Sequence, residues 1–481
     1  MVQHPDVLSH RVGGAPVRAA DGGPELALTD PWSGEVVARA PVGGEAEADA
    51  AVAAARKAAG AWARTDPAVR GQAISALADL VRAHADQLAQ LQTRENGKPL
   101  HMSRGDVDAA AGSLAQYAQL GPLHRGRSLQ GTWGATDLMV HEPRGVAALI
   151  IPWNDPLGIL AGLLGATVVA GNSVVVKPSE RATAAVARLV ELADEAGLPP
   201  GVVNLLLGDA SSGAALVAHA GVDLVAHVGS VSTGRRIAEA CAGQLKKVLL
   251  ELGGKDPLIV DAGVDPRWAA RQAATGAFAN AGQICTSVER IYVHADVAAE
   301  FVEALVDEAE SQVLGDPADP ATTMGPLVDS GHRDAVHAHV TAALQAGAVL
   351  RAGGVVPKGP GAVSYPATVL TEVTEDMAVL RDETFGPVAP VRVVSSFDEA
   401  LQLACDSGYG LAASVLTPSQ AHAQRAWREL PAGTVKINDV WGGAPGGSAE
   451  PHRGSGLGFG YGPELLDEVT LTKVVHLSPA L

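Results

Sequence analysis

Short, continuous apolar runs alternate along this chain with longer segments whose apolar residues have helical spacing. Residues 145–151 (GVAALII) and 173–177 (SVVVK) are such runs. Strands buried on both faces of a parallel sheet have this composition, because helices cover both sides. The uncharged stretch 156–176 is predicted to be a buried helix that leads into the second of these strands. The alternation predicts an α/β fold with a mostly parallel sheet.

A second α/β unit is predicted after Gly253 and Gly254, where a new series of apolar runs begins. Between the runs lie Ala-rich segments with helical periodicity. The predicted strands are 145–151, 173–177, 203–207, 224–228, 257–260, 290–293, 391–394 and 434–437. The predicted helices are 45–62, 68–94, 183–196, 298–311 and 330–346.

The composition excludes several classes of protein. The 481 residues are 47% hydrophobic, which argues against disorder and favours two or three domains. A net charge of −18 makes nucleic acid or an anionic membrane an unfavourable partner. The stretch 156–176 is interrupted by Gly171-Asn172-Ser173, so its unbroken part is shorter than the roughly 20 apolar residues of a membrane span.

Cysteine usage and the N-terminus predict a cytoplasmic protein. The three cysteines form no disulfide framework and no zinc-ligand motif, which is typical of a reducing compartment. The first ten residues contain no basic patch followed by an apolar run, so no secretory signal is expected. We therefore predict no metal, no membrane and no nucleic acid as partners.

Cys285 and Glu251 supply the two groups that covalent chemistry on a carbonyl carbon needs. Each lies among glycines and small residues, in GQIC and LELGG respectively. A thiolate is a strong nucleophile, and a nearby carboxylate can activate water. Asn154 ends the 145–151 strand, where its amide could stabilise an oxyanion. Taken singly, Cys285 could equally be a small buried hydrophobe and Asn154 a turn residue.

Two segments at strand ends are candidates for nucleotide binding. Gly229 and Ser230 follow the strand 224–228 and open a helix, where backbone N–H groups can bind phosphate. Lys177, Ser179 and Glu180 end the strand 173–177, and ligands of open α/β sheets bind at such ends. Each segment could also be an ordinary turn or a solvated surface pair. A third loop, 381–388, offers an aromatic ring and a carboxylate to a ligand, or is a tight turn.

The order and spacing of these motifs are more specific than any one of them. From about residue 30 to the C-terminus the chain resembles the NAD(P)-dependent aldehyde dehydrogenase superfamily. The matching motifs are PWN (152–154), KPSE (177–180), VGS (228–230), LELGGK (250–255), GQIC (282–285), ETFGP (383–387) and AGTVKIN (432–438).

The resemblance implies two Rossmann-type α/β domains and a small β oligomerisation flap. The implied NAD-binding domain is 1–120 with 144–252, and the catalytic domain is 253–445. The flap would be 121–143 with 463–481, exchanging strands in a homodimer or homotetramer. The alternating segment 469–477, with Lys473 on its apolar face, independently predicts an edge strand that needs a partner.

The resemblance also implies a mechanism. Cys285 would attack the aldehyde, with Asn154 holding the oxyanion of the thiohemiacetal. Hydride transfer to the nicotinamide would leave a thioester, and Glu251 would activate the water that hydrolyses it. The implied cofactor contacts are Trp153, Lys177, Ser179, Glu180, Gly229, Ser230, Leu252, Glu383 and Phe385. Glu180 would favour NAD by repelling the 2′-phosphate of NADP, although Lys177 could still attract that phosphate.

Other reaction classes fit the motifs less well. A CoA-acylating aldehyde dehydrogenase would use the same cysteine and fold, but it needs no base at Glu251. A cysteine hydrolase would need a histidine beside the thiolate, and no histidine motif indicates one. A non-catalytic protein on this scaffold would be expected to lose Cys285, Asn154 or Glu251, and all three are present.

The predicted substrate contacts are Asp155, Ile284, Thr286 and Trp441. Relatives often have an aromatic residue at the position of Asp155, and Gly158 and Gly162 follow it here. Together with an aromatic content of 4%, this predicts a wide, polar tunnel for a hydroxylated or cationic aldehyde. Asp155 could instead cap the helix that it precedes. In the atypical glycine-rich loop 441–463, His452 and Arg453 could contact an acidic substrate or be solvated.

Overall fold

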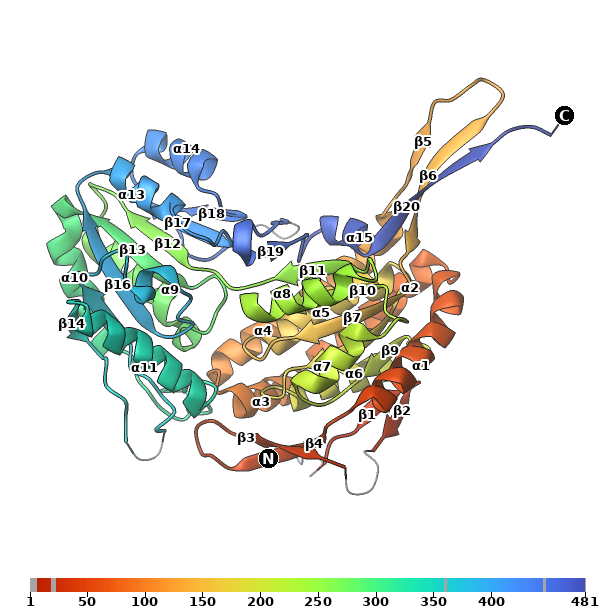
Figure 1. The fold of residues 1–481 in the computed structure, drawn as a ribbon, viewed down its shortest axis with the longest axis horizontal. Coiled ribbons are helices and arrows are strands. Elements are labelled where there is room, and N and C mark those ends of the chain that lie inside the picture. Colours follow the sequence, from red (N-terminus) through yellow and green to blue (C-terminus); the bar gives the residue numbers. More distant parts are fainter. Residues whose placement is uncertain (1–6, 19–22, 359–360, 444–446, 481) are drawn as a thin grey trace.

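A computed structural model describes residues 7–18, 23–358, 361–443 and 447–480. The chain forms two α/β lobes that lie side by side, and a narrow sheet projects from one of them (Figure 1). The first lobe holds α1 to α8 and the second holds α9 to α14 (Figure 1). The predicted α/β class is therefore confirmed.

The first lobe is built on a sheet with the strand order β19-β11-β10-β7-β8-β9-β1-β2. Its central strands β7 to β11 are parallel, and β19, β1 and β2 are antiparallel additions at the edges. Buried apolar clusters lie on both faces, as the continuous apolar runs predict. The strands are β1 (His10–Val12), β2 (Ala15–Val17), β7 (Val146–Ile151), β8 (Ser173–Pro178), β9 (Val203–Leu205), β10 (Leu224–Val228), β11 (Lys247–Glu251) and β19 (Gly456–Leu457). The helices are α1 (Glu45–Ala63), α2 (Pro67–Ala83), α3 (Ala85–Asn96), α4 (Leu100–Leu120), α5 (Pro156–Val169), α6 (Ala184–Glu195), α7 (Ala210–Ala218) and α8 (Val231–Ala242).

The second lobe has its own sheet, in the order β14-β15-β16-β13-β12-β17-β18, with β14 the antiparallel edge. The strands are β12 (Asp256–Val260), β13 (Val288–His294), β14 (Val349–Ala352), β15 (Thr368–Thr371), β16 (Val388–Val394), β17 (Ala412–Leu416) and β18 (Thr434–Ile437). The helices are α9 (Pro266–Phe278), α10 (Ala295–Glu310), α11 (Ser330–Gln345), α12 (Ala378–Arg381), α13 (Phe397–Cys405) and α14 (Gln420–Glu429).

One predicted helix is wrong in extent. Residues 68–94 form α2 and α3 rather than a single helix, with the break at His84. The His84 ring nitrogen Nδ1 lies 2.9 Å from the Leu80 carbonyl oxygen, and its backbone leaves the helical region at φ −108°, ψ 20°. A side chain that binds the backbone of the preceding turn competes with helix continuation, and periodicity alone does not reveal this.

Helix α5 confirms the interpretation of the stretch 156–176 as a helix that leads into a strand. Almost every residue of α5 is buried between the first sheet and the helices outside it. Among the described residues, no helix is both long and apolar enough to cross a membrane.

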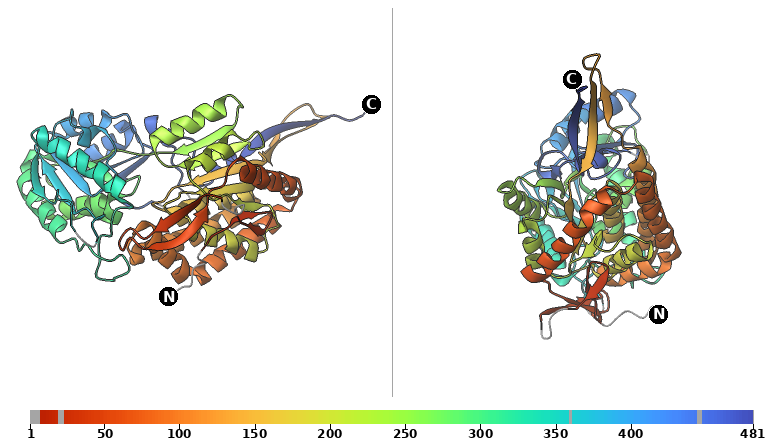
Figure 2. Two further views of the ribbon diagram at one scale, coloured as in Figure 1. Left: turned by 60° about the horizontal axis from the view of Figure 1, so that its bottom comes forward. Right: turned by 90° about the vertical axis from the view of Figure 1, so that its right-hand side faces the viewer.

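The projecting sheet consists of β5 (Arg127–Leu129), β6 (Thr136–Pro143) and β20 (Thr470–Leu477), in the order β20-β6-β5. It extends away from the first lobe in all three views (Figures 1 and 2). Strand β20 is an edge strand, as predicted, and Lys473 forms an ion pair with Glu142 on β6. Trp133, between β5 and β6, is fully exposed.

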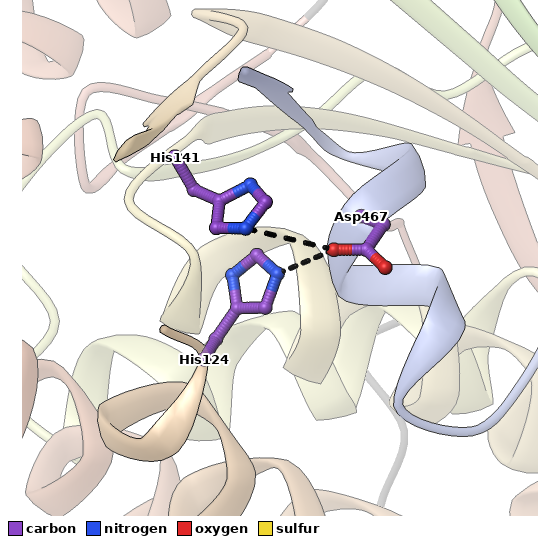
Figure 3. A group of neighbouring side chains, drawn as sticks. All are labelled: His124, His141 and Asp467. Atoms are coloured by element: carbon purple, nitrogen blue, oxygen red, sulfur yellow. Dashed lines mark hydrogen bonds and ion pairs between the residues drawn. The ribbon is translucent and has the colours of Figure 1, made fainter. Parts of the chain in front are cut away.

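A polar cluster fixes the base of the projecting sheet to α15 (Glu464–Glu468), as Figure 3 shows. His124 Nε2 lies 2.7 Å from Asp467 Oδ1, and His141 Nε2 lies 3.9 Å from the same oxygen. The two imidazole rings stack with centroids 4.1 Å apart. The His124–Asp467 contact is an ordinary hydrogen bond. We therefore interpret the group as a structural contact that joins segments distant in sequence.

Candidate active site

Cys285 follows a strained turn that precedes β13. Asn280, Ala281 and Gly282 have positive φ angles of 50°, 54° and 71° in succession. A side chain on Gly282 would place its Cβ 2.2 Å from the Gly386 carbonyl oxygen, so only glycine fits there. This turn brings the thiol against the loop 383–387 of the same lobe.

Gln283 locks this turn in place. Its side chain accepts a 2.9 Å hydrogen bond from the Val328 N–H and donates a 3.0 Å bond to the Asn280 carbonyl. Its own carbonyl accepts a 3.0 Å bond from the Asn154 amide. Asn154 of the first lobe, the candidate donor to an oxyanion, is therefore hydrogen-bonded to the loop of the second lobe that carries Cys285.

Glu251 ends β11, and the two glycines after Leu252 let the lobes approach closely. A Cβ on Gly253 would lie 2.1 Å from the Glu383 carboxylate, and one on Gly254 would lie 2.8 Å from the Cys285 carbonyl oxygen. The LELGG motif thus places a carboxylate near the thiol and leaves room for the chain to cross between lobes.

A buried ion pair positions the loop of Glu383 and Phe385. Lys255 Nζ lies 2.6 Å from Glu289 Oε2, and both side chains are almost wholly buried. The Glu289 carboxylate also accepts hydrogen bonds from the backbone N–H groups of Thr384 (2.7 Å) and Phe385 (2.8 Å). Phe385 is held at a φ of 51° by these contacts.

Cys285, Asn154 and Glu251 line one cavity of about 310 Å³ between the lobes. Six of the predicted cofactor contacts line it as well: Trp153, Gly229, Ser230, Leu252, Glu383 and Phe385. The Trp153 and Phe385 rings meet edge-on with centroids 5.5 Å apart. The structure therefore brings together side chains that are up to 232 residues apart in sequence, from Trp153 to Phe385.

A second cavity, of about 810 Å³, opens between α7 and α8 and contains the other predicted cofactor residues, Lys177, Ser179 and Glu180. Trp153, Gly229 and Ser230 line both cavities, so the two form one continuous chamber. Ser230 caps α8, and its hydroxyl accepts a 3.3 Å hydrogen bond from the Thr233 N–H. The positive end of the α8 dipole therefore faces this chamber.

Burial and neighbouring carboxylates shape the protonation of the site. Burial, with the Asp155 charge, raises the pKa of Glu251 to about 7. Burial and the charge of Glu251 raise the pKa of the Cys285 thiol well above its ordinary value. Burial, with the Glu289 charge, raises the pKa of Glu383 to about 8. Glu251 is thus poised as a base near neutral pH, while the thiol is protonated.

Asp155 adds a negative charge near Cys285 and Glu251, and it contributes to the raised pKa of both groups. Asp155 stands at the N-cap position of α5, but its side chain makes no capping hydrogen bond, which argues against the capping interpretation. Asp155 Oδ1 lies 4.0 Å from Lys98 Nζ, and Lys98 is paired more closely with Asp106. Two carboxylates therefore share one ammonium group.

The other predicted substrate residues differ in their surroundings. Ile284 and Thr286 flank Cys285 and are partly exposed, but neither is among the residues that line the 310 Å³ cavity. Trp441 packs against the core of the second lobe, with Lys436 Nζ 5.2 Å from its ring centroid. Residues 444–446 of the glycine-rich loop lie outside the described residues.

Several site residues have no sequence motif. Arg181, His332 and His339 line the 310 Å³ cavity, and the His332 Nε2 lies 2.7 Å from the Phe385 carbonyl oxygen. Tyr461 keeps 39% of its surface exposed and faces Gly162. Tyr461 lies within a run of alternating glycines, which is the one signal that could have identified it.

Arg453, for which contact with an acidic substrate and a solvated position were both open, binds the backbone of the second lobe. Its guanidinium donates to the carbonyl oxygens of Cys405 (2.8 Å) and Ser407 (2.5 Å). Arg453 therefore holds the glycine-rich loop against the second lobe, because its Nη1 group binds both backbone acceptors.

Comparisons with known proteins agree with this geometry. The model of the aldehyde dehydrogenase family matches residues 18–475. The NADP/NAD-dependent aldehyde dehydrogenase PuuC of Escherichia coli is 37% identical, over 93% of this chain and 91% of that protein. The betaine aldehyde dehydrogenase of Bacillus subtilis is 34% identical, over 93% of each chain.

Solved structures are similar over almost the whole length. The NAD-dependent aldehyde dehydrogenase of Sinorhizobium meliloti superposes with a TM-score of 0.96 at 36% identity, covering 99% of this chain and 96% of that one. A betaine aldehyde dehydrogenase of Staphylococcus aureus, solved in complex with NAD+, gives 0.95 at 32% identity, covering 98% and 96%. The chain therefore belongs to the aldehyde dehydrogenase family and is an NAD(P)-dependent aldehyde dehydrogenase.

Proposed function

We propose that this enzyme oxidises an aldehyde to a carboxylate with NAD, through a thioester on Cys285. The observation that carries the proposal is the convergence of the Cys285 thiol, the Asn154 amide and the Glu251 carboxylate on one cavity. These are the nucleophile, the oxyanion donor and the base that such a reaction requires.

The chamber between α7, α8 and the second lobe fits a dinucleotide. Its outer part of about 810 Å³ has apolar walls from the two helices, a helix N-terminus at Ser230, and Lys177 with Glu180 at a strand end. Ser179, Gly229 and Leu252 would border the cofactor, and Glu383 and Phe385 would hold its nicotinamide end. When bound, the oxidised nicotinamide supplies the hydride acceptor of the reaction.

NAD is the proposed cofactor, with NADP possible. The Glu180 carboxylate lies 3.8 Å from Lys177 Nζ, and the Glu180 side chain is 44% exposed. Lys177 also donates a 2.8 Å hydrogen bond to the Pro178 carbonyl. The Glu180 carboxylate would repel a 2′-phosphate at this strand end. Lys177 would attract the phosphate less strongly than a free lysine, because its ammonium group already binds Pro178 and lies near Glu180.

In the first half of the reaction, the Cys285 thiol releases its proton to water in the site, and the thiolate attacks the aldehyde carbon so that the carbonyl oxygen becomes an oxyanion. Asn154 would donate to that oxygen, and its existing hydrogen bond to the Gln283 carbonyl keeps the amide oriented toward the nucleophile loop. An oriented donor of this kind stabilises developing negative charge without reorganisation. The thioester then forms when the aldehyde carbon loses hydride, for which the bound nicotinamide would supply the acceptor.

In the second half, Glu251 would take a proton from water as the water attacks the thioester carbon and releases Cys285. The raised pKa of Glu251, about 7, suits a base that works near neutral pH. A CoA-acylating enzyme has no use for this base, so Glu251 favours hydrolysis over transfer to CoA.

We propose a hydroxylated or cationic aldehyde as the substrate. Asp155 and Asp106 outnumber the single Lys98 near the site, and the Tyr461 ring, with its polar hydroxyl, packs over Gly162. An unbranched apolar aldehyde would gain nothing from these carboxylates. A low micromolar Michaelis constant for propanal would contradict this substrate class.

The experiment that tests the function follows NADH absorbance on a panel of aldehydes, with NAD or NADP and with or without CoA. We expect turnover without CoA, its loss in Cys285→Ala, and no loss in the matched control Cys405→Ala. Turnover that requires CoA would assign the enzyme to the acylating class instead.

We also propose a cytoplasmic homodimer or homotetramer, with 1–120 and 144–252 binding NAD, 253–445 carrying the nucleophile, and 121–143 with 463–481 forming the flap. The exposed Trp133 and the unpaired edge of β20 support a second copy as the partner. Light scattering of the wild type and of Trp133→Ser tests this proposal. We expect an oligomeric mass for the wild type and a smaller mass for the variant, whereas a monomeric mass for the wild type would contradict the flap.

A further inference from the structure

His227 is a buried imidazole in the wall of the larger cavity. It lies on β10, two residues before Gly229, and only 6% of its surface is exposed. Ile150 pairs in register with His227 on one side and with Lys177 on the other. Partners in register on neighbouring parallel strands share a face, so His227 and Lys177 lie in one row beneath the chamber.

Neither ring nitrogen of His227 has a hydrogen-bond partner among the residues that the structure describes. The Ile150 carbonyl is near enough to favour the charged ring slightly, but it does not meet hydrogen-bond geometry. Burial lowers the pKa of His227 to about 4, so the ring is neutral and offers one N–H donor and one lone pair.

The ring also has a fixed position. A Cβ on Gly229 would lie 2.7 Å from the His227 Cε1, so the imidazole occupies the space that glycine leaves at the phosphate turn. A buried polar group without a partner destabilises the fold, and native proteins rarely retain one unless a ligand or water satisfies it.

We propose that His227 is a cofactor-contact residue whose imidazole forms a hydrogen bond with the ribose–pyrophosphate part of the dinucleotide. The position selects this part. The apolar slot between α7 and α8 suits the adenine ring, while His227 lies in the row between Lys177 and the Ser230 turn. The inference rests on the proposed function, because it concerns the same cofactor site.

The test compares wild type with His227→Phe, which keeps ring volume and removes both nitrogens. Titration calorimetry of NAD binding to the apoenzyme should show about tenfold weaker affinity. The melting temperature of the apoenzyme should rise, because the unpartnered polar group is gone. A ligand contact lowers NAD affinity while the melting temperature of the apoenzyme rises, whereas a structural role would lower both. An unchanged dissociation constant would overturn the proposal and make water the partner of the ring.

A second variant and two fragments sharpen the test. His227→Gln restores a donor and an acceptor and should recover part of the affinity, whereas equal losses in Phe and Gln would indicate a steric cause and overturn the contact. ADP-ribose should lose as much affinity as NAD in His227→Phe, and adenine, which lacks both the ribose and the pyrophosphate, should lose little. An equal loss for adenine would contradict the assigned position.

His10 provides the matched control. It is a fully buried histidine on β1 of the same sheet, its Nε2 has no partner within the described ranges, and its Nδ1 accepts from the Leu207 N–H. His10→Phe should lower stability and leave NAD affinity unchanged. Wild-type enzyme that bound neither NAD nor NADP would overturn the proposed cofactor together with this contact, whereas normal binding by His227→Phe would overturn the contact alone.

Discussion

The cofactor chamber and the aldehyde side of Cys285 meet at one thiol but are built differently. The chamber is made of strand ends, a helix N-terminus and a loop held by a buried ion pair, so each wall comes from a short contiguous motif. The proposed aldehyde side is made of single residues from separate elements, such as Asp155, Lys98 and Tyr461. A shared cofactor needs a fixed frame, whereas individual side chains can vary with the substrate.

The largest expected effect lies on the aldehyde side. Glu251→Gln should reduce steady-state turnover by about 10²- to 10⁴-fold, because the proposed base of thioester hydrolysis is lost. Acylation should survive, so stopped-flow absorbance should record a burst of NADH close to one equivalent per site. The exposed Glu310→Gln is the matched control and should behave as wild type. Loss of the burst in Glu251→Gln would mean that Glu251 acts before the thioester forms.

The next effect tests the frame of the chamber. Glu289→Ala leaves Lys255 buried without its partner and should lower the free energy of unfolding by about 3–5 kcal/mol. It should also free the N–H groups of Thr384 and Phe385 and weaken NAD binding. Urea denaturation and NAD titration measure the two effects. A destabilised variant with normal NAD affinity would show that the loop does not need this ion pair.

The pH dependence of hydrolysis follows from Glu251. Its carboxylate is the proposed base, so deacylation should fall about tenfold per pH unit below pH 7 and level off above it. Asp155→Asn removes a negative charge that raises this pKa, so the acidic limb should move to lower pH. Single-turnover release of the acid, measured across pH 5–9, would detect the shift. If the acidic limb of the pH profile stays at the same pH in Asp155→Asn, the Asp155 charge does not affect the base of hydrolysis.

The smallest effect concerns the choice of cofactor. Glu180→Gln should raise the ratio of NADP to NAD efficiency roughly fivefold, which corresponds to about 1 kcal/mol for a partly exposed charge. Ratios of kcat/KM for the two cofactors measure it, and raising ionic strength should shrink the difference. A ratio that stays constant would mean that Lys177 and the cavity shape decide the preference.

The sequence predicts the cofactor chamber better than the aldehyde side for a physical reason. Gly229, Ser230 and Lys177 lie at or directly after strand ends, and strand ends are visible as the limits of apolar runs. His332 reaches the site through tertiary packing, which no local pattern records, and only a run of alternating glycines marks the position of Tyr461. The apolar periodicity does not reveal the break at His84 either, since a side chain overrides the periodicity there.

The strained backbone before Cys285 sets stability against activity in laboratory evolution of this enzyme. Asn280 and Ala281 occupy left-handed conformations that cost non-glycine residues of the order of 1–3 kcal/mol each. Selection for heat resistance alone should therefore enrich glycine at position 281, since glycine adopts this conformation without strain. The same glycine would loosen the turn that aims the thiol, so libraries screened for turnover should reject the very substitution that thermal screens collect.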